Sequence, residues 1–138
     1  MTTTMTPALT ALFEAAKAAQ ERAYVPYSTF RVGAAVRSAN GAIHAGCNVE
    51  NAAYPVGNCA EASAIAAMIM AGETTIIEAL VVGDGTGLCT PCGGCRQRLR
   101  EFAALTTPVH VADRGGIRRS FTVDELLPAS FGPDNLAS

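Results

Sequence analysis

The sequence predicts a single α/β domain, a three-layer α/β/α sandwich around a mixed five-stranded sheet. Three observations predict it. The chain has 138 residues, the length of one domain. Apolar residues make up 49% and charged residues 16%, a composition typical of globular proteins. Predicted helices and strands follow one another in the order α-β-β-α-β-α-β-β, and such alternation favours helices on both faces of a sheet. We expect one domain over residues 1–138, with residues 1–6 and the last few residues loose.

The first part of the chain predicts one helix and a β-hairpin. The helix is expected over residues 7–23, and Pro7 suits its first position. Its apolar residues recur at helical spacing: Leu9, Leu12, Phe13, Ala16 and Ala19. Alternating apolar residues predict a strand over 30–37 and a return strand over 42–49. Asn40-Gly41 lies between them and is the strongest short hairpin signal in a sequence.

The remainder of the chain predicts two more helices and three more strands. Residues 58–71 read as an alanine-rich helix, apolar nearly all round and closed by Gly72, which predicts a buried helix. The other elements are expected at residues 75–82 (strand), 92–105 (helix), 108–112 (strand), 117–122 (strand) and 124–127 (one helical turn). The two strands that flank the helix at 92–105 should pair in parallel through that crossover, whereas the hairpin is antiparallel.

Charge and cysteine content narrow the class of protein. The net charge is −2, so no basic excess is available to hold a phosphate backbone. No basic residue precedes Lys17, and the apolar stretch at 62–71 is half the roughly 20 residues that a membrane helix needs. Five cysteines without a secretory signal favour a metal or a reactive thiol over disulfides. We expect a cytoplasmic protein with neither a nucleic-acid nor a membrane partner.

Three cysteines lie at the predicted starts of two helices. Cys59 opens one helix, and Cys92 and Cys95 open the other. Free N–H groups and a partial positive charge at a helix N-terminus favour thiolate, the form that binds metal. A catalytic zinc has three protein ligands and one open position, and Glu61 is close enough in sequence to reach a water bound there.

Each group has other interpretations when taken alone. Asn58 and Glu61 have the spacing of a capping box. Cys92 and Cys95 could be a redox pair or half of a structural zinc site, and Cys89 could supply a fourth cysteine ligand. The combined pattern Cys-Ala-Glu followed by Pro-Cys-x-x-Cys is the cysteine form of the zinc-deaminase signature, which favours the catalytic interpretation.

Beyond this signature, the chain resembles the short-form, homotetrameric cytidine deaminases over most of its length. The resemblance lies in five ordered segments: 24–35, 47–54, 59–61, 91–97 and 126–131. It implies zinc-dependent hydrolysis of cytidine and deoxycytidine to uridine and deoxyuridine, with release of ammonia, in pyrimidine salvage. Cys59, Cys92 and Cys95 would hold one zinc ion per subunit. Glu61 would move protons from the attacking water to ring N3 and to the leaving amino group.

The resemblance also assigns substrate contacts. Asn48 and Glu50 would bind the sugar hydroxyls, for which an amide and a carboxylate are suited. The Ala60 backbone N–H would meet the pyrimidine carbonyl, and Phe30 would form a wall against the base.

Family tetramers complete the pocket across subunits, and Tyr54 and Phe131 are the positions expected to do this here. In one respect the chain departs from the family: cysteine-type members commonly carry Arg directly after the catalytic Glu, where this chain has Ala62. Another arginine or the two helix N-termini would then offset the negative charge of a three-thiolate zinc site.

Two alternative functions remain open at this level. A deaminase of a modified or antibiotic cytosine nucleoside, of the blasticidin-S type, would also lack that arginine, although Glu50 would repel the carboxylate of such a sugar. A non-catalytic structural-zinc or thiol protein is the alternative from another class.

Overall fold

The structure, a computed structural model, describes residues 4–137 and contains one mixed sheet with strand order β2-β1-β3-β4-β5. Its elements are α1 (Pro7–Gln20), β1 (Val32–Ser38), β2 (Ile43–Cys47), the 3-10 helix η1 (Tyr54–Val56), α2 (Ala60–Met70), β3 (Ile76–Gly83), α3 (Gly93–Phe102), β4 (Pro108–Asp113), β5 (Gly116–Thr122), α4 (Val123–Leu126) and the 3-10 helix η2 (Pro133–Asn135). Within residues 4–137, no helix has both the length and the apolar composition needed to cross a membrane.

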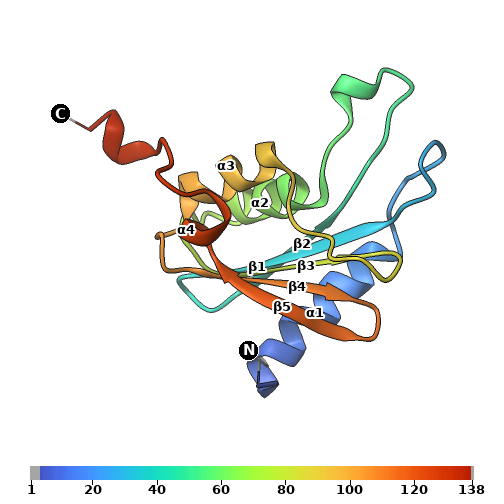
Figure 1. The fold of residues 1–138 in the computed structure, drawn as a ribbon, viewed down its shortest axis with the longest axis horizontal. Helices are drawn as coiled ribbons and strands as arrows, with labels where there is room; N and C mark the ends of the chain where they lie inside the picture. The colour runs from blue at the N-terminus through green and yellow to red at the C-terminus, as the bar shows by residue number, and fades with distance from the viewer. Residues whose placement is uncertain (1–3, 138) are drawn as a thin grey trace.

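The sheet topology confirms the predicted mixed sandwich. β3 and β4 pair in parallel through α3, and the remaining neighbours pair antiparallel. Figure 1 shows α1 on one face of the sheet and α2 and α3 on the other. Both predicted pairings, the hairpin and the crossover, are therefore present.

The helices are shorter than their sequence patterns predicted. α1 ends at Gln20 rather than near 23, and α3 ends at Phe102 rather than near 105. Thr6 is the N-cap of α1, and its hydroxyl accepts a hydrogen bond from the Leu9 N–H at 3.1 Å. Of the ends that were expected to be loose, residues 1–3 and 138 lie outside the described residues.

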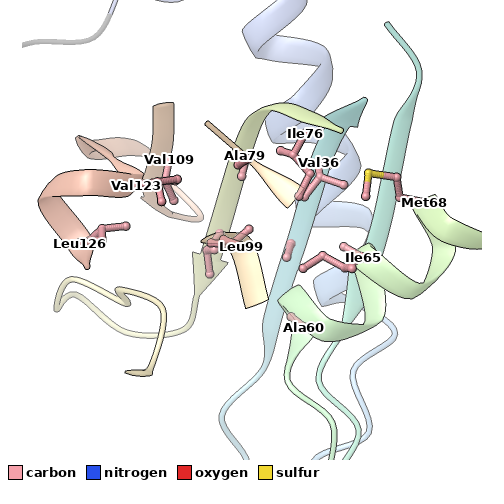
Figure 2. Close-up of a cluster of buried hydrophobic side chains, with 14 residues drawn as sticks. Val36, Ala60, Ile65, Met68, Ile76, Ala79, Leu99, Val109, Val123 and Leu126 are labelled. Atoms are coloured by element: carbon pink, nitrogen blue, oxygen red, sulfur yellow. The ribbon is translucent and has the colours of Figure 1, made fainter. Parts of the chain in front are cut away.

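Two apolar clusters fill the space between the layers. One joins α2, α3 and α4 to the sheet, and Figure 2 shows Ile65 and Met68 of α2 near Val36 of β1. The other joins α1 to the opposite face. Glycine allows the closest approaches, because a Cβ on Gly33 would lie 2.0 Å from the Ala16 carbonyl oxygen of α1. On β2, a Cβ on Gly46 would lie 2.4 Å from the backbone nitrogen of Ala64 in α2.

The prediction that α2 is buried on all sides was wrong. Ala60, Ala64 and Met68 face the sheet and are buried, but Ile69 is 41% and Met70 is 86% exposed. The sheet covers only one side of this helix, so its apolar composition leaves an apolar outer face within the single chain.

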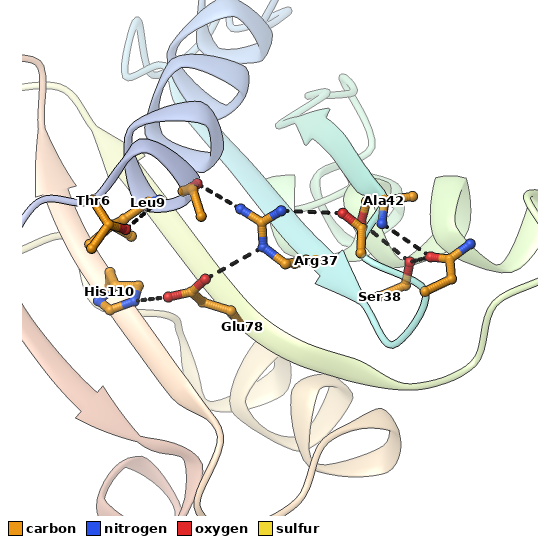
Figure 3. A network of polar contacts seen from close by, with 10 residues as sticks. Thr6, Leu9, Arg37, Ser38, Ala42, Glu78 and His110 are labelled. Atoms are coloured by element: carbon orange, nitrogen blue, oxygen red, sulfur yellow. Dashed lines mark hydrogen bonds and ion pairs between the residues drawn. The ribbon is translucent and has the colours of Figure 1, made fainter.

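A polar network links α1 to β1, β3 and β4 (Figure 3), and His110 extends it to β5. The Arg37 guanidinium donates to the Ala8 carbonyl at 2.6 Å and lies 3.6 Å from the Glu78 carboxylate. Glu78 also contacts His110 Nε2 at 2.8 Å, and His110 Nδ1 contacts Ser120 Oγ. Both ring nitrogens of His110 are thus engaged within the fold.

Candidate active site

The starts of α2 and α3 bring three cysteines together. Cys59 is the N-cap of α2, Cys92 is the N-cap of α3, and Cys95 lies in the first turn of α3. Their three Sγ atoms all lie within 4.8 Å of one another. Sulfur ligands placed 2.3 Å from a tetrahedral zinc lie roughly 3.8 Å apart, so a small contraction lets this cluster hold the ion.

The capping box expected from Asn58 and Glu61 is absent. Cys59 occupies the N-cap position, and no side chain caps α2. Asn58 instead pairs through its backbone with Val49, with N–O distances of 2.9 Å and 2.8 Å. Because of this pairing, the segment that follows β2 lies against the start of α2.

The thiols of the cluster differ in acidity. The backbone N–H of Cys95 donates to the Cys92 sulfur and lowers the pKa of that thiol. Burial, followed by the influence of the neighbouring acidic groups, raises the pKa of Cys95, and burial also raises that of Cys59. A coordinated cation reverses this balance, since a metal-bound thiol is deprotonated. The donor set therefore suits a divalent metal with a preference for sulfur, such as zinc.

Glu61 lies in the first turn of α2 and is 5% exposed. Burial is the largest influence on its carboxyl and raises the pKa, while the Arg98 guanidinium acts weakly in the opposite direction. A carboxyl with a raised pKa can both accept and return a proton near neutral pH. Its position fits a proton carrier beside the cysteine cluster.

A cavity of about 200 Å³ opens onto this cluster, lined by Cys59, Ala60, Glu61 and Cys92 and by five further residues. Those further residues are Val32, Asn48, Val81, Cys89 and Thr90. Burial raises the pKa of Cys89 to about 11. Among the described residues, Cys89 is not part of the metal-binding group. The three-cysteine interpretation is therefore favoured over a closed four-cysteine site.

A larger cavity of about 500 Å³ adjoins the first, and the two share Asn48 and Cys59. Its lining comes from the loop before β1 and from the loop that joins β2 to α2, including Tyr27, Ser28 and Glu50. The site thus has an inner part beside the cysteines and an outer part between two loops.

Asn48 and Glu50 hold these two loops together. The Asn48 side chain accepts from the Val32 N–H at 2.9 Å and donates to the Phe30 carbonyl at 3.0 Å. Glu50 Oε1 accepts from the backbone N–H groups of Tyr27 and Ser28 at 2.9 Å and 3.1 Å. Hydrogen bonds from Ser28 lower the pKa of the Glu50 carboxyl and keep it ionised. The bond from the Ser28 side chain has the largest effect.

The three aromatic candidates lie in different places. Tyr54 lines the outer cavity and is 75% exposed, with its ring 5.8 Å from that of Tyr27. Phe30 and Cys89 both lie beside Gly83. A Cβ built on Gly83 would be 2.5 Å from Cys89 Sγ and 3.4 Å from the Phe30 ring. Phe131 is in neither cavity of its own chain.

The segment that carries Phe131 runs along α3, where the Gln97 side chain donates to the Phe131 carbonyl at 2.8 Å. Figure 1 shows the loop after β2 and the C-terminal segment projecting at opposite ends of the molecule. The structure therefore brings together the predicted site residues except Phe131 and Phe30, since the Phe30 side chain lines neither of the two cavities.

Sequence reasoning missed two residues at the inner site. Cys89 lines the inner cavity, whereas its position in the sequence pointed only to a possible fourth metal ligand. The sequence pattern gave no role to Arg98, which contacts Cys95 Sγ. Arg98 follows Cys95 by three residues, and this spacing places two residues on the same face of a helix. That spacing was the one available signal.

Comparisons with known proteins agree with this geometry. The family model described as "Cytidine and deoxycytidylate deaminase zinc-binding region" matches residues 7–111. A cytidine deaminase from Sporosarcina psychrophila is 41% identical over 126 residues, which is 91% of this chain and 93% of that protein. The crystal structure of cytidine deaminase from Burkholderia pseudomallei superposes with a TM-score of 0.84 at 43% identity, covering 92% of this chain and all of that one. With this similarity along most of its length, the chain belongs to the zinc-binding cytidine deaminase family.

Proposed function

We propose that this chain catalyses the zinc-dependent hydrolytic deamination of cytidine and deoxycytidine to uridine and deoxyuridine. The observation that carries the proposal is the buried Glu61 carboxyl beside three Sγ atoms within 4.8 Å of one another, at the wall of a cavity of about 200 Å³. The relatives named cytidine deaminase that match most of the chain support the substrate class.

Cys59, Cys92 and Cys95 would hold a zinc ion, which would supply the Lewis acidity that lowers the pKa of the attacking water. Glu61 accepts a proton from this water and delivers it to ring N3 as the oxygen adds to C4. Glu61 then takes the second proton from the oxygen now bonded to C4 and transfers it to the exocyclic amino group; the C4–N bond breaks, ammonia leaves, and the oxygen becomes the uridine carbonyl. The net reaction consumes one water for each ammonia released.

The remaining site residues bind the nucleoside. The Ala60 N–H, at the start of α2, donates to the pyrimidine carbonyl, since the first N–H groups of a helix have no partner within it. Phe30 packs against the base. Asn48 and Glu50 keep hydrogen-bonding capacity beyond their contacts with the loops, and this capacity serves the sugar hydroxyls.

The active assembly is a homotetramer in which each pocket is completed by another subunit. Three exposed apolar features support it: the outer face of α2, Tyr54 at the rim of the outer cavity, and Phe131, which lines neither the inner nor the outer cavity of the site in its own chain. Tyr54 and Phe131 are then the residues shared between subunits. The mass in solution, measured by light scattering, tests the assembly.

Each subunit is one domain, and the enzyme serves pyrimidine salvage in the cytoplasm. Five free cysteines support that location, since thiols persist in a reducing compartment.

The test is ammonia release from the zinc-loaded protein with cytidine, deoxycytidine and blasticidin S. Glu61→Gln removes the proton carrier and preserves the side-chain shape. We expect it to lower kcat by about 10²–10⁴-fold, the range typical of general acid–base catalysis, with zinc still bound.

Glu14→Gln is the matched control, since Glu14 is exposed on α1, across the sheet from the site. Absence of ammonia from all three nucleosides, with zinc bound, would contradict the proposal. Release from blasticidin S alone would establish the antibiotic-nucleoside alternative instead.

A further inference from the structure

A zinc site with three thiolates carries one net negative charge, and the position after Glu61 holds Ala62, which offers no cation. Uncompensated negative charge beside the metal weakens its Lewis acidity and favours protonation of the thiolates. The two arginines nearest the cluster in sequence, Arg96 and Arg98, both lie on α3.

Arg96 has its guanidinium engaged elsewhere. Its Nε donates to the Pro91 carbonyl and its Nη1 donates to the Leu126 carbonyl, both at 2.8 Å. These bonds connect the start of α3 to the end of α4. Arg96 is thus a structural tie between two helices.

Arg98 reaches the cluster directly. It lies one turn after Cys95, and its Nη1 donates to Cys95 Sγ at 3.8 Å. Long side chains on a helix lean toward the N-terminus, which brings this guanidinium back over the first turn of α3. Gly94 leaves the space that it needs, because a Cβ there would lie 3.1 Å from Arg98 Nη1.

Arg98 forms none of the ion pairs among residues 4–137, which involve other cations. The acidic side chain that its charge influences is Glu61 of the same site. Its side chain is exposed, but within the described part of the chain its hydrogen bond is to the sulfur of a proposed metal ligand, Cys95. A cationic donor to a thiolate makes a charge-assisted hydrogen bond, and such outer partners tune a metal site and hold its ligands in place.

We propose that Arg98 is the positioning residue that offsets the negative charge of the three-thiolate zinc site, through its hydrogen bond to Cys95 Sγ. The proposal rests on the proposed function insofar as the metal is zinc with three cysteine ligands. It replaces the contribution that an arginine after Glu61 would make. Arg98 acts through Cys95 and does not touch the substrate.

The experiment compares wild type, Arg98→Gln, Arg98→Lys and Arg96→Gln. Zinc affinity is measured at fixed pH by competition with a chromophoric chelator, and the thiolate-to-metal charge-transfer band is recorded with Co²⁺ in place of zinc. We expect Arg98→Gln to weaken zinc binding by about 10-fold or more, the usual effect of losing an outer partner of a metal ligand. The Co²⁺ band should shift to longer wavelength, because the Cys95 sulfur becomes more electron-rich.

The two other variants separate the specific contact from the loss of charge. Arg98→Lys keeps the cation and should recover most of the zinc affinity. Arg96→Gln removes one positive charge from the same helix and should leave the zinc affinity and the Co²⁺ band close to wild type. An unchanged affinity and band in Arg98→Gln, or equal losses in Arg98→Gln and Arg96→Gln, would overturn the proposal.

These readouts are independent of turnover. Loss of zinc affinity in Arg98→Gln, in a protein that releases no ammonia from any nucleoside, would reject the proposed function and retain the role of Arg98. Normal deamination together with unaltered metal binding in Arg98→Gln would retain the proposed function and reject the role of Arg98.

Discussion

The inner and outer parts of the site are built in different ways. At the inner part, Cys59, Glu61 and Cys95 are set by the first turns of two helices that pack against the sheet. At the outer part, Asn48 and Glu50 lie on loops, and their side chains hold those loops through hydrogen bonds to backbone groups.

This difference separates a preformed site from an open one. Cys95 is buried and Glu61 is 5% exposed, whereas Tyr54 at the outer rim is 75% exposed. Chemistry that moves protons requires fixed geometry, which packed helix starts provide. Under the proposed function, a sugar is bound by groups that adjust to it, and the two loops that line the outer cavity provide these.

The largest expected effect comes from removing a ligand at the inner part. Cys95→Ala should abolish stoichiometric zinc binding and lower activity about a thousandfold or more, because a metal that supplies several kcal/mol of transition-state stabilisation is lost. Metal content and ammonia release measure it. Cys47→Ala, a half-buried cysteine on β2 outside the cluster, is the matched control and should keep its zinc. Full zinc content in Cys95→Ala would remove the three-cysteine assignment.

The next effect tests how rigidly the inner part is packed. Gly46→Ala places a Cβ 2.4 Å from the backbone nitrogen of Ala64, so α2 must move away from β2. We expect the free energy of unfolding to fall by about 2–3 kcal/mol, the cost of overpacking a close contact. Gly57→Ala is the outer-part control, since its nearest contact would be an ordinary 3.4 Å. Urea denaturation measures the free energy of unfolding of both variants. Equal values would mean that the inner and outer parts accommodate an added Cβ equally well.

A smaller effect is expected when the hydrogen bonds of Asn48, which hold the two loops of the outer part together, are removed. Asn48→Ala leaves the Val32 N–H and the Phe30 carbonyl without their side-chain partner. Loss of these two hydrogen bonds should lower the free energy of unfolding by about 1–3 kcal/mol. It should also raise KM more than it lowers kcat. Zinc content should not change, because Asn48 is not in the cysteine cluster. A lower zinc content with an unchanged KM would place Asn48 with the inner part instead.

The smallest expected effect concerns the dependence of stability on pH. Hydrogen bonds hold the folded pKa of Glu50 below its ordinary value of 4.5. Ionised Glu50 therefore stabilises the fold at neutral pH, and this contribution is lost as the pH falls below about 4.5 through the lowered folded pKa. The difference in Tm between wild type and Glu50→Gln should be positive at pH 7 and shrink at more acidic pH. A difference of constant size down to pH 3 would show that hydrogen bonding, without charge, accounts for it.

Much of the fold was predictable, because it depends on local signals. Asn40-Gly41 predicted the β1–β2 hairpin, and the apolar strand patterns on either side of α3 predicted the parallel pair. The end of α1 and the state of the outer face of α2 were not predictable. Whether an apolar helix is covered depends on which elements, or which other chains, reach it.

For the candidate site, the motifs that contain the three cysteines and Glu61 could be identified along the chain, since helix starts and short spacings are properties of adjacent residues. Three other features follow from how the chain folds: Asn48 hydrogen-bonds to the loop before β1, Cys89 lines the inner cavity, and Arg98 rather than Arg96 contacts the cluster. They could not be predicted because a side chain's partners depend on the packing of distant segments. Within one turn of a helix, the spacing of two residues predicts that they share a face of the helix. It does not predict that their side chains are in contact.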